Sequence, residues 1–191
     1  MVEGKKIGIV VPAYNEEPWI RRVLESMPSF VDEVTVVDDC SRDRTAAEVQ
    51  ACKEKDPKIF LVRHPENQGV GKAIVTGYQR ARENGLDVVA VMAGDAQMDP
   101  DDLAAVVTPV VRGEVDYAKG NRLFRGESWR TIPHSRYLGN AVLSLLTKIA
   151  SGYWHIGDSQ CGYTAISRAA LELLCLEEVY PRYGVPNDLL I

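Results

Sequence analysis

The chain has 191 residues, which suits one domain with a sizeable core. Apolar residues make up 46% and the formal net charge is −5, so the composition argues against nucleic-acid binding through a broad basic face. An anionic substrate stays possible, because a local cation or metal can override a weak global field. The sequence contains no apolar run long enough to span a membrane, and its first residues turn polar too soon for a signal peptide, so we expect neither feature in it. Its four cysteines form no CxxC pair and have no His at metal-ligand spacing, which favours thiols in a reducing compartment over a zinc site.

Apolar strand-like runs alternate with segments of helical periodicity along the chain as far as Arg122. Runs rich in Val and Ile predict strands, and apolar residues spaced three or four apart predict helices. Strands are expected at 6–14, 31–39, 58–64, 86–95 and 115–122, and helices at 16–27, 41–55, 69–85 and 99–113.

Local signals predict where three of these helices begin or end. Ser41 is an N-cap candidate for the second helix, and Gly85 closes the third. Asp99 and Pro100 start the fourth. Beyond Arg122 the alternation weakens, and we expect a loop at 123–135, a helix at 136–152, a strand at 161–168 and a helix at 169–176.

This alternation predicts an α/β fold with a mostly parallel sheet covered by helices on both faces. In such sheets the ligand crevice lies outside the carboxyl ends of the strands. We expect residues 1–191 to form one domain. The chain stops within an apolar run, so we also expect that a longer parent protein continues beyond it.

Polar side chains follow four of the expected strands at their carboxyl ends. They lie at 12–16, 38–39, 95–97 and 120–122. Each group alone has an ordinary explanation as a helix cap or a solvated turn. Together they indicate a ligand site, because the carboxyl ends of parallel strands meet at one edge of the sheet.

The segment "ENQGVGKA" resembles two phosphate-binding motifs and matches neither. A P-loop needs Gly where Glu66 stands and Ser or Thr where Ala73 stands. The dinucleotide motif needs a third Gly where Ile74 stands. A tight turn into the helix explains the glycines equally well. An anion held by backbone N–H groups and Lys72 at a helix N-terminus stays open.

Taken in order, "VPAYNEE", "DDCSRDRT", "NQGVGKAIVTGY", "GDAQMDPDDL", "KGNR" and "DSQCGYTAISR" resemble glycosyltransferase family 2 with the GT-A (Rossmann-like) fold. Within it, the motifs are most similar to the dolichyl- or polyprenyl-phosphate sugar transferases, such as dolichol-phosphate mannosyltransferases. The resemblance runs from the first expected strand to Arg168.

The resemblance implies a nucleotide-sugar site and a metal motif. The pocket for the donor's base and ribose would comprise Pro12, Ala13, Tyr14, Glu16, Val37 and Asp39. Asp39 would hold the base or ribose by charge-assisted hydrogen bonds. Asp95, Ala96 and Gln97 would form the metal motif, with Asp95 and Gln97 on the same side of an extended chain. Hard oxygen ligands point to Mg²⁺ or Mn²⁺ bridging the donor diphosphate.

The resemblance also implies an acceptor region in the later part of the chain. Arg122 would neutralise the donor diphosphate or the acceptor phosphate. Three further arginines, which solvated loop charges would also explain, are candidates for the acceptor phosphate. These three are Arg125, Arg130 and Arg136, and the polar segment beside sugar and acceptor is Asp158, Ser159 and Gln160. Asn187 and Asp188 match a polar-acidic pair near the sugar.

The implied reaction moves a hexose with inversion from a nucleotide-diphosphate sugar, GDP-mannose or UDP-glucose, to a polyprenyl or dolichyl monophosphate. Such an acceptor is already an anion and needs no general base. A hydroxyl acceptor would need one, and Asp158 or Asp188 is then the candidate. Segment 123–139 combines arginines with aromatic residues, which suits either ordinary packing or contact with anionic lipid heads. We therefore expect a peripheral protein at the cytoplasmic face of a membrane.

Three other functions have to be weighed. The first is a family-2 transferase that glycosylates a saccharide hydroxyl. The second is a nucleotidyltransferase, although "VPAYNEEPWIRR" lacks the glycine- and lysine-rich signature expected after its first strand. The third is a non-catalytic module that binds nucleotide sugars.

Overall fold

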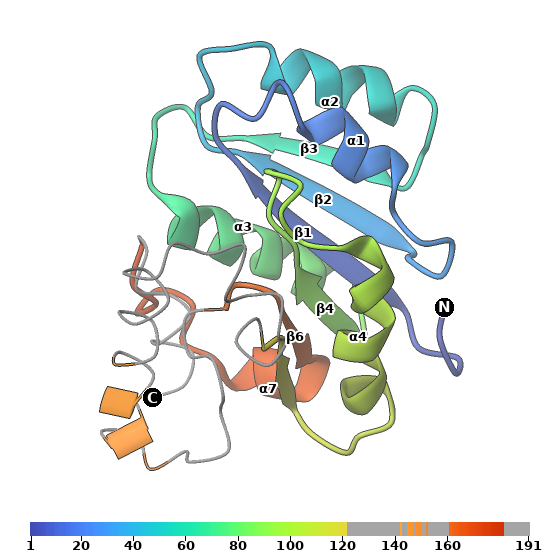
Figure 1. Ribbon diagram of the computed structural model, residues 1–191, viewed down its shortest axis with the longest axis vertical. Coiled ribbons are helices and arrows are strands. Elements are labelled where there is room, and N and C mark those ends of the chain that lie inside the picture. Colours follow the sequence, from blue (N-terminus) through green and yellow to red (C-terminus); the bar gives the residue numbers. More distant parts are fainter. Residues whose placement is uncertain (122–141, 143–144, 147, 150–151, 153–160, 182–191) are drawn as a thin grey trace.

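The computed structural model describes residues 1–121, 142, 145–146, 148–149, 152 and 161–181. Within them, the strands form one six-stranded sheet in the order β3-β2-β1-β4-β6-β5. Helices cover both of its faces (Figure 1). The mostly parallel α/β sheet expected from the sequence is thereby confirmed.

Four parallel strands make the core of the sheet, and an antiparallel strand extends it. β6 pairs antiparallel with β4 on one side and with β5 on the other. The strands are β1 Ile7–Ala13, β2 Glu33–Asp38, β3 Ile59–Arg63, β4 Val88–Val91, β5 Tyr117–Lys119 and β6 Thr164–Ser167.

The helices divide between the two faces of the sheet. α1, α2 and α4 pack into one apolar cluster, and α3 and α7 into the other. Their bounds are α1 Ile20–Glu25, α2 Thr45–Lys53, α3 Val70–Glu83, α4 Leu103–Val111 and α7 Arg168–Leu173, with a 3-10 turn at Pro100–Asp102 before α4.

Strand β1 lies at the centre because both of its faces are apolar. Ile7, Ile9 and Val11 belong to the cluster with α1, α2 and α4, whereas Val10 faces α3. All four are at most 1% exposed. A strand buried on both sides reads as a continuous apolar run, which is the pattern that the sequence shows.

Some boundaries differ from those expected. The first two helices begin at Ile20 and Thr45, later than predicted, and β4 already ends at Val91. The expected N-cap at Ser41 is wrong, because its hydroxyl accepts a hydrogen bond from the backbone N–H of Asn15 at 2.9 Å. Polar residues before both helices bond the neighbouring loop, so the helices start only beyond them. The predicted cap at Asp99 is confirmed, as its side chain accepts from the 3-10 turn.

Helix α3 lies unusually close to β1 at Gly77. A Cβ atom there would lie 2.2 Å from Cγ1 and 2.6 Å from Cγ2 of Val10. Val10 is β-branched and buried in the central strand, so it has little freedom to move aside. The missing side chain therefore sets how near α3 comes to the sheet.

We predict that Gly77→Ala lowers the free energy of unfolding by about 2 kcal/mol, because overpacking outweighs the helix propensity of roughly 1 kcal/mol that Ala adds. Urea denaturation measures the difference. Gly8→Ala is the matched control. Its Cβ would meet Cδ1 of Leu86 at 2.2 Å, which is the mobile tip of a side chain, so the loss should be smaller. Equal losses in the two variants would contradict this explanation.

Candidate active site

A cavity of about 410 Å³ opens at the carboxyl ends of β1 and β4. Its walls come from segments 12–16, 67–73 and 93–95 together with Asp39. This is the edge of the sheet where parallel α/β folds bind their ligands. A cavity of this size fits a ligand of the dimensions of a nucleotide.

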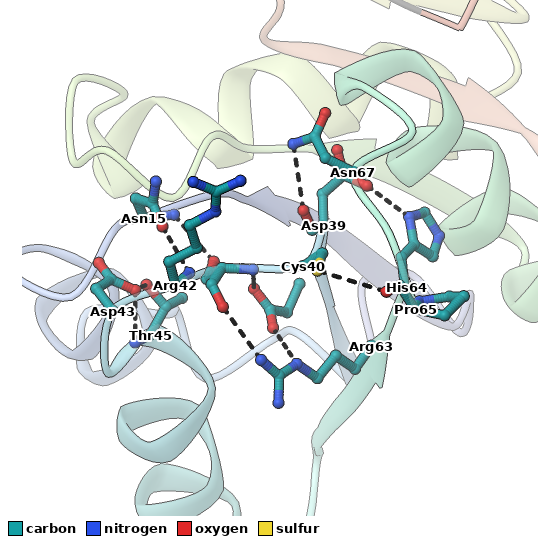
Figure 2. A network of polar contacts seen from close by, with 12 residues as sticks. Asn15, Asp39, Cys40, Arg42, Asp43, Thr45, Arg63, His64, Pro65 and Asn67 are labelled. Carbon is teal, nitrogen blue, oxygen red and sulfur yellow. Dashed lines mark hydrogen bonds and ion pairs between the residues drawn. The ribbon is translucent and has the colours of Figure 1, made fainter.

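The wall built by residues 12–16 is held by a second loop, as Figure 2 shows for part of the contacts. The backbone N–H of Arg42 donates to Oδ1 of Asn15 at 2.8 Å. The backbone N–H of Glu16 donates to Oγ1 of Thr45 at 2.8 Å. Asn15 also has a left-handed φ of 57°, which few residue types other than Gly tolerate as well as Asn. The two loops thus satisfy each other's polar groups, and this fixes the entrance of the cavity.

Asp38 is the last residue of β2, and it does not line the cavity. Its carboxylate is fully buried and forms an ion pair with Nε of Arg63 at 3.0 Å. The backbone N–H of Ser41 donates to its Oδ1 at 3.1 Å. A buried carboxylate requires such partners, so Asp38 serves the loop geometry.

Asp39 lines the cavity and anchors the segment that enters α3. Its Oδ1 accepts from the backbone N–H of Gln68 at 2.9 Å, and its Oδ2 accepts from that of Gly69 at 2.8 Å. Its Oδ1 also lies 2.7 Å from Nδ1 of His64. The sequence analysis considered the N-terminus of this helix as an anion site. In the structure, the carboxylate of Asp39 accepts hydrogen bonds from the backbone there. The backbone N–H of Lys72 is likewise engaged, by the carbonyl of Pro181 at 3.1 Å.

Asp95 lies in a tight turn and not at the end of an extended strand. Ala96 has a φ of 58°, and the backbone N–H of Gln97 donates to Oδ1 of Asp95 at 3.0 Å. The extended geometry expected for residues 95–97 is therefore wrong. A second contact closes the turn at its base, where the backbone N–H of Ala93 donates to Sδ of Met98 at 3.2 Å. Asp95 lines the cavity, whereas the side chain of Gln97 is exposed.

The carboxylate of Glu16, which lines the cavity, is repelled by other carboxylates. Burial raises the pKa of Glu16 above its ordinary value, and the nearby carboxylates of Asp95 and Asp43 raise it further. Like charges that face one another in a cavity favour a bound cation. Carboxylate oxygens are ligands that Mg²⁺ and Mn²⁺ prefer, so these residues fit a divalent metal.

The structure brings most of the predicted donor residues together and leaves some apart. Pro12, Ala13, Tyr14, Glu16, Asp39 and Asp95 all line the cavity. Val37 is fully buried within β2, and neither it nor Lys72, Ala96 or Gln97 is part of the cavity wall. The predicted residues Arg122, Arg125, Arg130, Arg136, Asp158, Ser159, Gln160, Asn187 and Asp188 lie outside the described residues.

Residues of two wall segments were not assigned to the site by sequence reasoning. Asn67, Val70 and Ala73 line the cavity from the entry of α3, and Ala93 lines it from the end of β4. The available signal was the position of the glycine-rich segment, which directly follows β3 at the ligand edge. His64 follows the same strand and could have been found by the same rule.

Two further features apply to the part of the chain that the structure describes. No helix there combines the length and the apolar composition needed to cross a bilayer. No group of three or more His, Cys, Asp or Glu side chains there is arranged to hold a metal ion by itself.

We predict that Glu16→Gln stabilises the protein at neutral pH. Because the pKa of Glu16 is raised on folding, the folded state binds its proton more tightly, and stability is lost as the pH rises through the folded pKa. The variant removes that penalty. Urea denaturation at about pH 7 should show a higher free energy of unfolding than for the native chain, and the difference should shrink near pH 4. A variant that is less stable than the native chain at neutral pH would contradict an unfavourable charge on Glu16.

The sequence of this chain is similar to those of several lipid-phosphate sugar transferases. A UDP-N-acetylglucosamine–dolichyl-phosphate N-acetylglucosaminyltransferase of Methanococcus voltae is 32% identical over 200 residues, which is 98% of this chain and 79% of the relative. A dolichyl-phosphate beta-glucosyltransferase of Trichomonas vaginalis is 26% identical, with coverages of 97% and 60%. A dolichol-phosphate mannosyltransferase of Pyrococcus furiosus is 27% identical, with coverages of 87% and 47%.

The fold is also similar to that of a solved enzyme. Glucosyl-3-phosphoglycerate synthase of Mycobacterium tuberculosis, crystallised with Mn²⁺, UDP-glucose and phosphoglyceric acid, superposes with a TM-score of 0.75 at 25% identity. The match covers 98% of this chain and 64% of the synthase. Residues 8–174 match the family described as glycosyl transferase family 2. The chain therefore belongs to glycosyl transferase family 2, and it is a glycosyltransferase with the GT-A fold.

Proposed function

We propose that this chain transfers a hexose from a nucleotide-diphosphate sugar, with GDP-mannose and UDP-glucose as the candidate donors, to a polyprenyl or dolichyl monophosphate, with Mg²⁺ or Mn²⁺ as cofactor. The observation that carries the proposal is the division of the cavity. The anchored wall around Asp39 and the interacting carboxylates of Glu16 and Asp95 line the same cavity. Such a site suits a ligand with a nucleoside at one end and a metal-bound diphosphate at the other.

The described residues can divide the binding of the donor between them. Residues 12–14 and Asp39 would enclose the base and ribose, where Tyr14 is 42% exposed and offers an aromatic face. Asp95, and Gln97 in a shifted rotamer, would hold the metal at the diphosphate. A bound divalent cation would neutralise charge on the leaving diphosphate. Arg122 stays a prediction for the same task.

The reaction needs no base from the protein if the acceptor is a phosphate. An oxygen of the lipid monophosphate forms a bond to the anomeric carbon on the face opposite the leaving group. The bond from that carbon to the diphosphate oxygen breaks, and the nucleotide diphosphate keeps the electron pair. The anomeric centre inverts. Arg125, Arg130 and Arg136, with Ser159 and Gln160, stay the predicted contacts of the acceptor phosphate.

The names of the sequence relatives favour a dolichyl-phosphate acceptor. Such an acceptor places the enzyme at a membrane surface, and the use of nucleotide sugars suits the cytoplasmic face. The likeness to the glucosyl-3-phosphoglycerate synthase favours a second candidate, transfer to a hydroxyl of a small water-soluble acceptor. In that case Asp158 or Asp188 is the predicted general base.

A panel of donors and acceptors tests the proposal. UDP-glucose, UDP-N-acetylglucosamine and GDP-mannose are each incubated with Mg²⁺ or Mn²⁺ and with polyprenyl phosphate in detergent, a free saccharide or 3-phosphoglycerate. Nucleotide diphosphate and glycosylated acceptor are both measured. We expect lipid-linked sugar with one of these donors. Transfer to the water-soluble acceptors alone would contradict the lipid-phosphate acceptor.

In the same assay we expect Asp95→Ala to reduce turnover by about 100-fold or more, because the cavity then loses its central metal-facing carboxylate. Asp101→Ala is the matched control. Asp101 is an exposed acid of the 3-10 turn that follows the same segment, and it does not line the cavity. Turnover that persists in Asp95→Ala would contradict a metal-facing role of Asp95. A native chain that binds the donor without any turnover would support the non-catalytic binding module.

Gln97 gives a separate test of the metal motif. Gln97→Asp adds a negative charge to the turn, so we expect the Mn²⁺ concentration for half-maximal activity to fall by about threefold or more. Gln97→Asn is the control, because it has the length of Asp and no charge. Equal metal dependence of the two variants would show that position 97 does not bear on the ion.

A further inference from the structure

His64 forms a buried link between the cavity wall and helix α3. It follows the last residue of β3, and its backbone N–H donates to the carbonyl of Asp38 at 2.9 Å. The residue is 7% exposed. Its Nδ1 lies 2.7 Å from Oδ1 of Asp39, and its Nε2 lies 3.0 Å from Oγ1 of Thr76 in α3. Figure 2 shows the contact with Asp39.

Chemistry fixes the roles in this chain of contacts. An ionised carboxylate accepts hydrogen bonds and donates none, so Nδ1 of His64 carries the hydrogen that points to Asp39. In the neutral ring, Nε2 is then an acceptor, and the hydroxyl of Thr76 donates to it. Both ring nitrogens are therefore committed, and the ring has one orientation.

Asp39 depends on this ring for its own orientation. Three donors from the described residues meet its carboxylate, namely the ring of His64 and the backbone N–H groups of Gln68 and Gly69. Oδ1 receives two of them and Oδ2 receives one. An ionised carboxylate has about four acceptor positions, so one position on Oδ2 is left for a ligand. Asp39 lines the cavity, whereas His64 does not.

We propose that His64 is a positioning residue for the donor nucleotide: its ring holds the Asp39 carboxylate so that the remaining acceptor position of Oδ2 faces the base or ribose. The inference rests on the proposed function. His64 would thus influence donor binding indirectly, through Asp39. Removing the ring's N–H deletes the shortest of the three contacts and frees the carboxylate to rotate about its Cβ–Cγ bond.

Two substitutions separate the two ends of the ring. The side-chain nitrogen of Asn is as many bonds from Cα as Nδ1 of His, and that of Gln as many as Nε2. His64→Asn should therefore keep a donor for Asp39 and lose the contact with Thr76. His64→Gln should do the reverse. Both variants replace the ring by an amide, so both lose the same kind of packing.

The readout is the binding of UDP and of GDP, each with Mn²⁺, to the full chain by titration calorimetry. We expect His64→Gln to weaken the binding of the nucleotide about tenfold and His64→Asn to weaken it about threefold or less. Donor KM should follow the same order, with kcat little changed, because the acting group contacts the donor and not the reacting carbon.

A stability control and a double-mutant cycle exclude a merely structural effect. Ser167→Ala removes the side-chain cap at the start of α7. Ser167 pairs with Val88 at the start of β4, whereas the cavity lies at the other end of that strand. The substitution should therefore lower thermal stability without changing nucleotide affinity. In an Asp39→Asn background, His64→Gln should have no further effect on affinity.

The outcomes are distinct. If the native chain binds neither UDP nor GDP, the proposed function is overturned together with the role of His64. If it binds one of them and His64→Gln binds equally well, only the role of His64 is overturned. Equal weakening in His64→Asn and His64→Gln, in step with their loss of stability, also overturns it.

Discussion

The geometry of the site depends on the carboxylate of Asp39, because a buried charge is stable only when hydrogen-bond donors from the chain surround it. Its donors come from the end of β3 and from the entry of α3. One negative group thereby joins β2, β3 and the first turn of the helix. The same group lines the cavity, so the requirement to satisfy a buried charge also shapes the wall that would receive a nucleoside.

The acids at the edge of the sheet divide into two kinds by their surroundings. Asp38 and Asp39 are buried, and each is held by donors or a cation from neighbouring segments, so they fix the loops in place. Glu16 and Asp95 face the same cavity, and their mutual repulsion raises the pKa of Glu16 beyond the effect of burial. Proteins retain such destabilising pairs where function requires them. The second kind therefore marks where a cation would act.

Local patterns were sufficient to predict the sheet, its helices and the edge that carries the cavity. The apolar runs of β1 and β4 and the acids after them are properties of single segments. Contacts between distant segments were not predictable in this way. Ser41 bonds Asn15 and not its own helix, and Asp39 occupies the N-terminus that Lys72 had suggested for a ligand. The turn at Ala96 was not predictable either, because its left-handed φ occurs at an alanine, whereas glycine and asparagine are the residues that usually indicate such a φ.

Gly94 connects the packing of the fold to the charge of the site. It lacks a positive φ, so its small size is what matters. A Cβ there would lie 3.3 Å from Cδ1 of Ile20 and 3.4 Å from the carbonyl oxygen of Pro12. The absence of a side chain lets the turn after β4 approach the end of β1, and this brings Asp95 within electrostatic reach of Glu16. Close packing in the core thus creates the concentration of negative charge that would hold the divalent cation of the proposed reaction.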